Sequence, residues 1–393
     1  MSELPRVHLK KNEDRRVRIG HPWVFSNEVE RFEGPIEEGG LVDVYSFGRT
    51  FLARGYINTQ SQIMLRVLSR EPEEIDGKFF LKRIRRAIQY RDAFARGRDA
   101  VRVVFSEADF LPGLIVDRYL DYLVVQTTTL GMERHLGTVL DCLEELFSPT
   151  AIVLRNDAHP RAQEGLPLHK EVARGTYENP LLVRDMSIVL VADLMRGQKT
   201  GLFLDQSENR AALSGIVDGK RVLDSFCYLG AWGIEAARQG AAETVLVDSS
   251  PRAVEMAKRC AALNGVLERC EFVQENCFSY LSRLHMTGER FDVVIVDPPG
   301  LVKSKRRLRA GVELYQRINT DAMKLLPPGG ILITCSCSHN VDREIFLGLL
   351  ARSARIAKRD VQIVETRSQS RDHPILLAGR VSEYLKCVTL QVW

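Results

Sequence analysis

The chain has 393 residues, 45% of them hydrophobic and 27% charged, so it can bury real cores and stay soluble. Its formal net charge of +4 argues neither for nor against nucleic acid, because the clustering of charge matters more than its sum. No run approaches the roughly 18 apolar residues of a membrane helix. The eight scattered cysteines include no CxxC pair, which excludes the framework of a secreted disulfide protein. We expect a cytoplasmic protein of two or three domains, with no membrane partner.

Residues 1–70 predict a small β-rich module. LVDVYS and FLARGYI are short strand-like runs, separated by the glycine-containing turns EEGG and SFGRT. Basic residues gather before these runs, and contacts to phosphates need such residues on one face. We therefore expect Lys10 and Lys11 to contact RNA.

The middle of the chain predicts a linker helix and then a mixed segment. Residues 71–98 form the helix, since Phe80, Ile84 and Ile88 fall on one stripe. Its basic cluster of Lys82, Arg83, Arg85 and Arg86 is first of all a solvated face, with RNA contact as the second interpretation. Residues 99–190 show strand-like runs before and after a helical stretch near 132–147, and they carry no recognisable chemistry.

Residues 191–393 alternate strand and helix. RVLDSF, ETVLVDSS, CEFVQEN, FDVVIVDPP and GGILITCSCS read as strands with helical segments between them. This alternation predicts βαβ units and a mainly parallel, doubly wound sheet, so the fold class is α/β. Ligands of such sheets bind beyond the carboxyl ends of the strands.

The predicted strand ends carry polar residues that suit a nucleoside. Asp248 ends the second strand, where a carboxylate can hold the two hydroxyls of a ribose. The alternative is a role in capping the next helix, which Ser249 or Ser250 could perform and so leave the carboxylate free. Asn276, after the third strand, is expected near the adenine.

The turn after the first strand argues against a dinucleotide. Asp224 is followed by SFCYLGAWG, with Gly230 and Gly233 in place of a GxGxxG fingerprint. A pyrophosphate needs close backbone approach at a helix start, and Tyr228 and Leu229 crowd this turn. The pattern therefore favours S-adenosylmethionine over NAD.

Several motifs resemble one family over essentially the whole chain. They are GQKTGLFLDQSENR at 197–210, DPPGLVKSK at 297–305, TCSCS at 334–338, RDHPILL and EYLK near the end, and GHPWVF in the basic front module. Together they resemble the bacterial 23S ribosomal RNA large-subunit cytosine-C5 methyltransferases. The resemblance implies an N-terminal PUA domain, a central strand-strand-helix-strand-strand α+β domain over 99–190, and a Rossmann-like class I methyltransferase domain over 191–393.

The resemblance also implies which residues would hold the cofactor, S-adenosylmethionine. The residues expected to bind it are Lys199, Thr200, Asp224, Gly230, Asp248, Ser249, Asn276 and Asp297.

Cytosine C5 chemistry gives the stretch ITCSCSHN a function. C5 is a poor nucleophile until a group adds to C6, and a thiolate suits that task. Asp297, at the end of the neighbouring strand, can hydrogen bond near N3 as the adduct forms. Cys335 and Cys337 share one face of a strand, so strand geometry does not choose between them. The spacing from Gly329 and the SCS pattern of the family assign Cys337 as the nucleophile.

Other interpretations of the two cysteines stay open. Both thiols can simply be buried, and a metal site with His339 is the weakest alternative, because no second ligand group lies elsewhere. Gly300 follows the DPP motif, where methyltransferases acting on amines resemble each other in an aromatic residue, so N-methylation is disfavoured. One subgroup of relatives has a cysteine there, and its absence leaves the base that removes the C5 proton undetermined.

The predicted function is methylation of C5 of one cytosine in 23S ribosomal RNA, through a covalent bond between Cys337 and C6. The alternatives are an RNA N-methyltransferase acting on guanine or adenine, and a non-catalytic assembly factor that binds ribosomal RNA. Phosphate contacts are expected from Lys303, Lys305, Arg306 and Arg307. The sequence does not identify the target cytosine. It also leaves open whether the substrate is naked RNA or an assembly intermediate, and whether the protein forms a homodimer.

Overall fold

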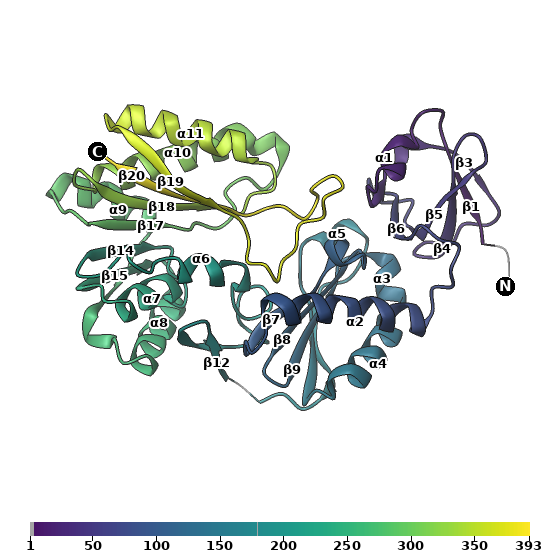
Figure 1. Ribbon diagram of the computed structural model, residues 1–393, viewed down its shortest axis with the longest axis horizontal. Helices are drawn as coiled ribbons and strands as arrows, with labels where there is room; N and C mark the ends of the chain where they lie inside the picture. Colours follow the sequence, from purple (N-terminus) through teal and green to yellow (C-terminus); the bar gives the residue numbers. More distant parts are fainter. Residues whose placement is uncertain (1–3, 179) are drawn as a thin grey trace. The chain divides into compact units, whose positions relative to one another are not determined.

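The computed structural model describes residues 4–178 and 180–393, and the chain forms two compact units (Figure 1). Unit 1 comprises Met1–Leu181, Ala192–Leu204 and Arg371–Ser382. Unit 2 comprises Leu182–Val191, Asp205–Ser370 and Glu383–Trp393. Each unit is therefore built from separate stretches of the chain, and each is described by itself below.

The front of unit 1 is a six-stranded sheet with the order β2-β6-β5-β4-β1-β3. Its elements are β1 (Arg6–Leu9), α1 (Arg15–Arg18), β2 (Trp23–Val24), η1 (Ser26–Glu28), β3 (Val29–Glu33), β4 (Leu41–Tyr45), β5 (Phe51–Ile57) and β6 (Leu65–Ser69). All pairs are antiparallel except β1 with β4. Alternate residues such as Val42 and Val44 enter a small apolar core, as period-2 patterning requires. The β-rich N-terminal module predicted from the sequence is confirmed.

The rest of unit 1 contains a five-stranded sheet with the order β11-β10-β9-β8-β7. Its elements are α2 (Gly77–Phe94), β7 (Ala100–Phe105), η2 (Ser106–Asp109), β8 (Leu114–Tyr119), β9 (Tyr122–Thr127), α3 (Leu130–Arg134), α4 (Leu136–Phe147), β10 (Ala151–Asn156), α5 (Pro160–Gln163) and β11 (His169–Gly175). Phe80 and Ile84 of α2 pack in the same core as the sheet. The Asp76 carboxylate caps the helix by accepting from Phe79 N.

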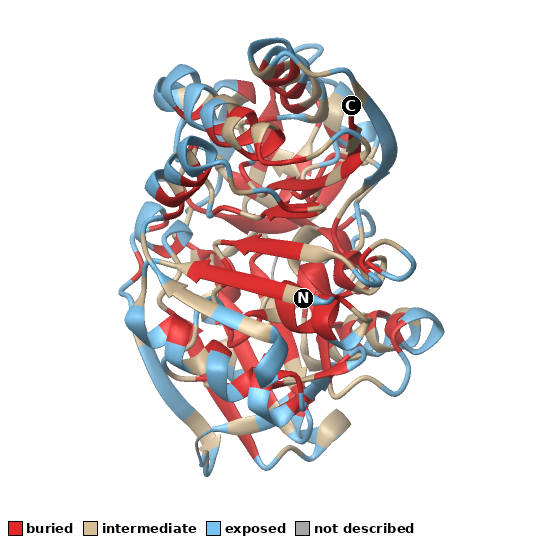
Figure 2. Ribbon diagram, turned by 90° about the vertical axis from the view of Figure 1, so that its left-hand side faces the viewer, coloured by how far each residue is buried: buried red, intermediate tan, exposed pale blue. Residues whose placement is uncertain are grey.

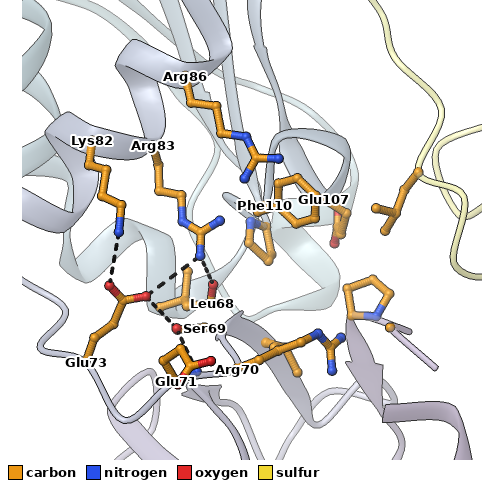
Figure 3. A pocket seen from close by; sticks show the side chains of 15 residues that line it. Leu68, Ser69, Arg70, Glu71, Glu73, Lys82, Arg83, Arg86, Glu107 and Phe110 are labelled. Atoms are coloured by element: carbon orange, nitrogen blue, oxygen red, sulfur yellow. Dashed lines mark hydrogen bonds and ion pairs between the residues drawn. The ribbon is translucent and has the colours of Figure 1, made fainter. Parts of the chain in front are cut away.

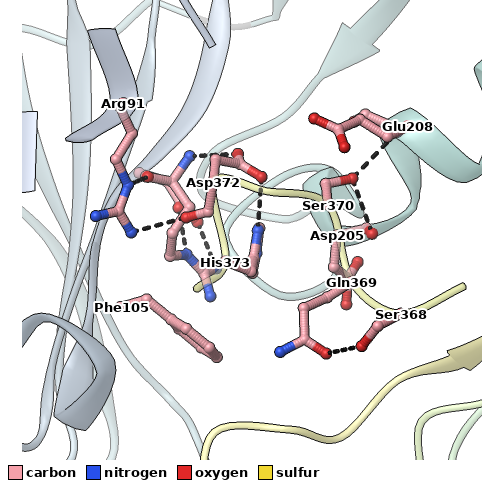
Figure 4. A network of polar contacts seen from close by, with 12 residues as sticks. Arg91, Phe105, Asp205, Glu208, Ser368, Gln369, Ser370, Asp372 and His373 are labelled. Carbon is pink, nitrogen blue, oxygen red and sulfur yellow. Dashed lines mark hydrogen bonds and ion pairs between the residues drawn. The ribbon is translucent and has the colours of Figure 1, made fainter. Parts of the chain in front are cut away.

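A buried polar network ties the segment 371–382 into unit 1 (Figure 4). Asp372 accepts from Arg102 N through Oδ2, and its carbonyl accepts from Arg91 Nη2 at 2.7 Å. Its other carboxylate oxygen lies 2.9 Å from His373 Nδ1, and the His373 ring packs on Phe105. Buried charges persist only when they are paired and hydrogen bonded. These contacts therefore fix the RDHP stretch within unit 1.

Unit 2 is built on a seven-stranded sheet with the order β16-β15-β14-β17-β18-β20-β19. Its main elements are η3 (Leu204–Gln206), α6 (Ser207–Ala211), β14 (Arg221–Ser225), α7 (Ala231–Arg238), β15 (Glu243–Asp248), α8 (Pro251–Leu263), η4 (Leu267–Arg269), β16 (Cys270–Gln274), α9 (Cys277–Thr287), β17 (Val293–Val296), η5 (Lys305–Arg307), α10 (Leu308–Lys324), β18 (Gly330–Ser336), α11 (Arg343–Ala357), β19 (Val361–Arg367) and β20 (Lys386–Val392). The first five strands of this order pair in parallel, and β20 is antiparallel to both of its neighbours. The predicted doubly wound α/β sheet is confirmed. A separate two-stranded sheet pairs β12 (Leu181–Asp185) with β13 (Ile188–Ala192).

The two faces of the large sheet are covered by different helices. Leu223, Val294 and Leu332 pack in a core with residues of α9, α10 and α11. Val222 and Ile295 pack in a second core that includes Trp232 and Ala236 of α7. Figure 2 shows the strands as mostly buried and the outer helix faces as mostly exposed. Because side chains alternate along a strand, this fixes which strand-end residues face α7.

Candidate active site

The turn between β14 and α7 is shaped by glycine. Gly230 has φ +75°, and a Cβ on it would lie 2.6 Å from Leu246 Cδ2. A Cβ on Gly233 would lie 2.8 Å from the Leu246 side chain. Phe226 and Tyr228 also have positive φ, at +64° and +50°, which is uncommon for bulky residues. The turn is therefore a tight, strained path around the end of β14, as strained segments at functional sites often are.

Asp224 lies buried beneath this turn. Its Oδ2 accepts from Gly233 N at 2.9 Å, whereas Oδ1 is buried and has no hydrogen-bond partner among the residues described. The pKa of Asp224 is raised to about 8, mainly by burial and in part by the nearby carboxylates of Asp297 and Asp248. A buried acceptor without a donor, with three carboxylates close together, fits a positively charged ligand.

Asp248 ends β15 and is fixed by two backbone donors. Its Oδ2 accepts from Tyr228 N at 3.0 Å and its Oδ1 accepts from Ser250 N at 2.9 Å. Ser250 caps α8 by accepting from Ala253 N, while Ser249 is exposed. Each carboxylate oxygen can accept more than one hydrogen bond. The capping role thus falls to Ser250, and the partly exposed Asp248 carboxylate can also accept from hydroxyls.

Asn276 is the N-cap of α9. Its Oδ1 accepts from Phe278 N at 3.0 Å and from Ser279 N at 3.3 Å, and the residue is exposed. The side-chain oxygen is thus used in helix capping. The expected contact of Asn276 with the adenine stays a prediction.

Asp297 follows β17 on the face that α7 covers. Its Oδ2 accepts from Gln206 Nε2 at 3.0 Å and from Trp232 Nε1 at 3.1 Å. Gln206 is itself oriented, because its Oε1 accepts from Asn209 Nδ2 at 2.7 Å. Neither donor of Asp297 was predicted from the sequence. The signals that could have found them are the tryptophan two residues after Gly230 and the glutamine in LDQSENR.

The two cysteines of the fifth strand differ in their surroundings. Cys335 is fully buried, lies in the apolar core on the α7 face, and is paired with Cys387 across β18 and β20. Burial raises the pKa of Cys335 well above its ordinary value, and Cys387 raises it further. Cys337 lies one residue beyond the end of β18 and is partly exposed.

The loop after Asp297 lies directly against Cys337. A Cβ on Gly300 would stand 3.7 Å from Cys337 Sγ and 3.6 Å from Ser338 Oγ. Ser338 Oγ accepts from Val302 N at 3.2 Å and lies 3.0 Å from the buried Tyr315 hydroxyl. These bonds hold the loop that contains Gly300 against the strand end. The size of the residue at position 300 therefore determines how much space lies beside the Cys337 thiol.

Lys386 supports the same strand end from β20. Its ammonium donates to the Ser338 carbonyl at 2.9 Å and to the Tyr384 carbonyl at 2.7 Å. The pKa of Lys386 is lowered to about 8, because the effect of burial outweighs the opposite effect of the neighbouring Cys337. A cation is thus held within electrostatic reach of Cys337. From the sequence, EYLK was only part of the family resemblance, and no function was predicted for Lys386.

Lys199 and Thr200 belong to unit 1. Thr200 is buried, donates to Asp117 Oδ2 at 2.5 Å, and lies 3.2 Å from the Tyr119 hydroxyl. The Lys199 ammonium lies 4.4 Å from the centre of the Phe203 ring. Their predicted contact with the cofactor stays a prediction.

The cations expected to bind RNA are exposed in both units. Lys10 donates to the Asn27 carbonyl at 2.8 Å in unit 1, and Lys11 follows it. In unit 2, Lys303 and η5 come directly after the Gly300 loop. The exposed cations of this second cluster are Lys303, Lys305, Arg306 and Arg307.

Within residues 4–178 and 180–393, no helix is long and apolar enough to cross a membrane. The same residues contain no group of three or more His, Cys, Asp or Glu side chains able to hold a metal ion.

The fold and site define a class I methyltransferase. Residues 175–374 match the S-adenosylmethionine-dependent methyltransferase family and residues 7–70 match a PUA-like domain. The cofactor is S-adenosylmethionine, and the buried, unpartnered oxygen of Asp224 fits a cofactor that carries positive charge.

Curated relatives narrow the family further. Ribosomal RNA large subunit methyltransferase I of Aeromonas salmonicida is 38% identical over 97% of both chains. The protein of that name in Shewanella amazonensis is 38% identical over 99% of both chains. The chain therefore belongs to the family of ribosomal RNA large subunit methyltransferase I.

The fold is shared with a more distant solved structure. A SAM-dependent methyltransferase from Streptococcus mutans has a TM-score of 0.85 at 19% identity, covering 98% of this chain and 99% of its own. Another methyltransferase structure, complexed with SAH, covers 100% of both chains at 19% identity with a TM-score of 0.85.

Proposed function

We propose that the chain methylates C5 of one cytosine in large-subunit ribosomal RNA, with Cys337 as the nucleophile that adds to C6. The observation that carries this proposal is the partly exposed Cys337 beside Gly300, at a strand end adjacent to that of Asp297. The relatives named as ribosomal RNA methyltransferases support the substrate class. Because the proposed substrate is bacterial ribosomal RNA, we expect the reaction to take place in the cytoplasm.

The environments of the two cysteines support Cys337 over Cys335. A thiol acts as a nucleophile in its thiolate form, which burial among apolar groups disfavours. Cys335 is buried in the core against Cys387. Cys337 instead lies at the strand end near the Lys386 ammonium, which favours a neighbouring negative charge.

Asp297 is the residue assigned to the far edge of the pyrimidine. Gln206 and Trp232 both donate to its Oδ2, so the carboxylate is held in one orientation. A fixed acceptor at N3 can stabilise the ring as the thiolate adds, without reorganising during the reaction. S-adenosylmethionine supplies the methyl group when bound. The chain then has to accept the C5 proton before the thiol leaves.

The site supports transfer to carbon better than transfer to an amine. Position 300 is glycine, so no ring stacks on the target base from that place, and the space lies next to a thiol instead. The exposed cations of residues 303–307 follow this loop and suit RNA phosphates. Bases inside a duplex are hidden, so the target cytosine has to be unpaired or flipped out.

Tritium release tests the reaction directly. Ribosomal RNA labelled with tritium at cytosine C5 should lose one tritium for each methyl group gained with the wild-type protein. Cys337→Ala should abolish both signals, while Cys335→Ala keeps them, because Cys335 is assigned only to the core. Methylation without tritium release would show that the acceptor is not C5, and full activity of Cys337→Ala would show that Cys337 is not the nucleophile.

A further inference from the structure

Unit 1 contains a cavity of about 370 Å³ where β6 and the residues after it face helix α2 (Figure 3). Arg70, Lys82, Arg83 and Arg86 line it together with the Phe110 ring. Its volume is near the lower limit for small-ligand sites, which is enough for about one nucleotide and too small for a duplex. The basic cluster of α2 thus has a cavity next to it.

Two of the three glutamates that line the cavity, Glu73 and Glu107, are already engaged, and the third, Glu71, is exposed. Glu107 accepts from Trp23 Nε1 at 2.8 Å and from Arg66 at 3.1 Å. Glu73 accepts from Ser69 Oγ at 2.6 Å and lies 3.7 Å from Lys82 Nζ, with Arg83 at 3.9 Å. Most of the negative charge is therefore neutralised locally.

The arginines are less fully balanced. Arg70 donates to the carbonyl oxygens of Val17 and His21, which are neutral acceptors. Burial lowers the pKa of Arg83, Glu73 offsets this in part, and the neighbouring Arg86 lowers it further. Burial also lowers the pKa of Arg70. Guanidinium groups held close together at a cavity wall suit an added anion, and their planar donors match phosphate oxygens.

Phe110 gives the cavity an aromatic face. The ring centre lies 5.6 Å from the Arg83 guanidinium carbon and 5.0 Å from that of Arg86. The residue is 38% exposed and has φ +59°, a conformation that bulky residues rarely adopt. Its backbone N–H donates to the Glu107 carbonyl at 3.1 Å, which helps to fix the turn. A strained, exposed aromatic ring beside two guanidinium groups suits base stacking as well as arginine orientation.

We propose that this cavity binds one unpaired nucleotide of the RNA substrate, with its phosphate on Arg83 and Arg86 and its base against Phe110. The inference rests on the proposed function only in taking RNA as the substrate. Single-stranded RNA is favoured because a base must leave its stack to enter a cavity of this size. The site supplies affinity in unit 1 and performs no chemistry.

Binding to a fluorescein-labelled single-stranded oligouridine tests the site. Fluorescence anisotropy at several salt concentrations gives both the Kd and its salt dependence. Arg86→Gln should lower the slope of log Kd against log salt by about 0.7, as expected for one lost phosphate contact. Phe110→Leu should weaken binding about 5- to 150-fold, the range for losing one stacked base.

The matched control is Arg85→Gln. Arg85 lies on the same helix, is exposed, and pairs with Glu145 at 3.0 Å without lining the cavity. It removes the same charge, so the slope should stay at the wild-type value. Equal changes for Arg85→Gln and Arg86→Gln, or wild-type affinity for Phe110→Leu, would overturn the proposal. Thermal melting and S-adenosylmethionine titration of each variant report whether the fold is intact.

Cross-linking places the RNA on the chain independently. Oligonucleotides that contain 4-thiouridine should cross-link to peptides with Phe110 or residues 67–70, and cross-links confined to other peptides would contradict the site. This outcome is separate from the proposed function. If the wild-type protein cross-links at this cavity but forms no 5-methylcytosine, the proposed chemistry alone is refuted. If it forms 5-methylcytosine but cross-links only at other peptides, the proposed nucleotide site alone is refuted.

Discussion

Lys386 offers a quantitative test of the strand end that carries Cys337. The residue is 5% exposed, and burial lowers its pKa from the ordinary 10.5 to about 8. Between these two pH values the unfolded chain holds a proton that the folded chain has released. Stability therefore rises with pH across this window, because the unfolded state binds more protons there.

The expected magnitude follows from proton linkage. One pH unit corresponds to about 1.4 kcal/mol, so the rise from about pH 8 to 10.5 amounts to about 3 kcal/mol. Lys386→Met keeps the length of the side chain and removes the titrating group. The difference in unfolding free energy between wild type and variant should therefore grow in favour of wild type by about 3 kcal/mol across the window.

Urea unfolding at closely spaced pH values, followed by tryptophan fluorescence, measures this difference. Other groups that titrate in the same range are common to both proteins and cancel. Lys258→Met is the control, since it removes the same charge from an exposed position on α8 of the same unit. If wild type and Lys386→Met run parallel from pH 8 to 10.5, the ammonium is not buried in the way described.

Three other predictions address the site. Iodoacetamide should modify Cys337 in the folded protein and leave Cys335 unmodified, as read by peptide mass spectrometry, because Cys337 is partly exposed and Cys335 is buried; equal rates would contradict this. Asp248→Asn should weaken S-adenosylmethionine binding about 10- to 150-fold in calorimetry, the range for losing a charged hydrogen-bond acceptor, and unchanged affinity would exclude it from the ribose site. Because the raised carboxyl pKa of Asp224 makes the stability of cofactor-free wild type fall as the pH rises from about 4 to 8, Asp224→Asn should gain stability relative to wild type over this range. The expected gain in unfolding free energy is up to about 1.4 kcal/mol per pH unit. Parallel dependence of the two unfolding free energies on pH, measured with urea, would refute the raised pKa.

The strand and helix alternation of unit 2 could be predicted because it is a local pattern. Runs such as FDVVIVDPP and GGILITCSCS carry their periodicity in a few residues, and they form β17 and β18 as neighbours. The placement of β20 between β18 and β19 could not be predicted in the same way. It depends on pairing between residues far apart in sequence, which no local signal reports.

The site residues also divide into those that a local sequence pattern indicates and those that only a contact between distant residues reveals. The carboxylates at the ends of β14, β15 and β17 were found because they follow recognisable strands. The donors Gln206 and Trp232 were missed, since their function appears only once they meet Asp297. Lys386 was missed for a related reason: its length suggests an exposed side chain, and only its two carbonyl contacts explain its burial.

The composition of unit 1 has a consequence for synthesis of the chain. Residues 371–382 complete this unit, and Asp372 supplies partners for both Arg91 and Arg102. During translation the first 181 residues leave the exit tunnel long before that segment exists. Arg91 therefore lacks one of its acceptors, the Asp372 carbonyl, until nearly the end of synthesis. A chain truncated shortly before residue 371 should thus have a destabilised unit 1, although most of that unit is synthesised first.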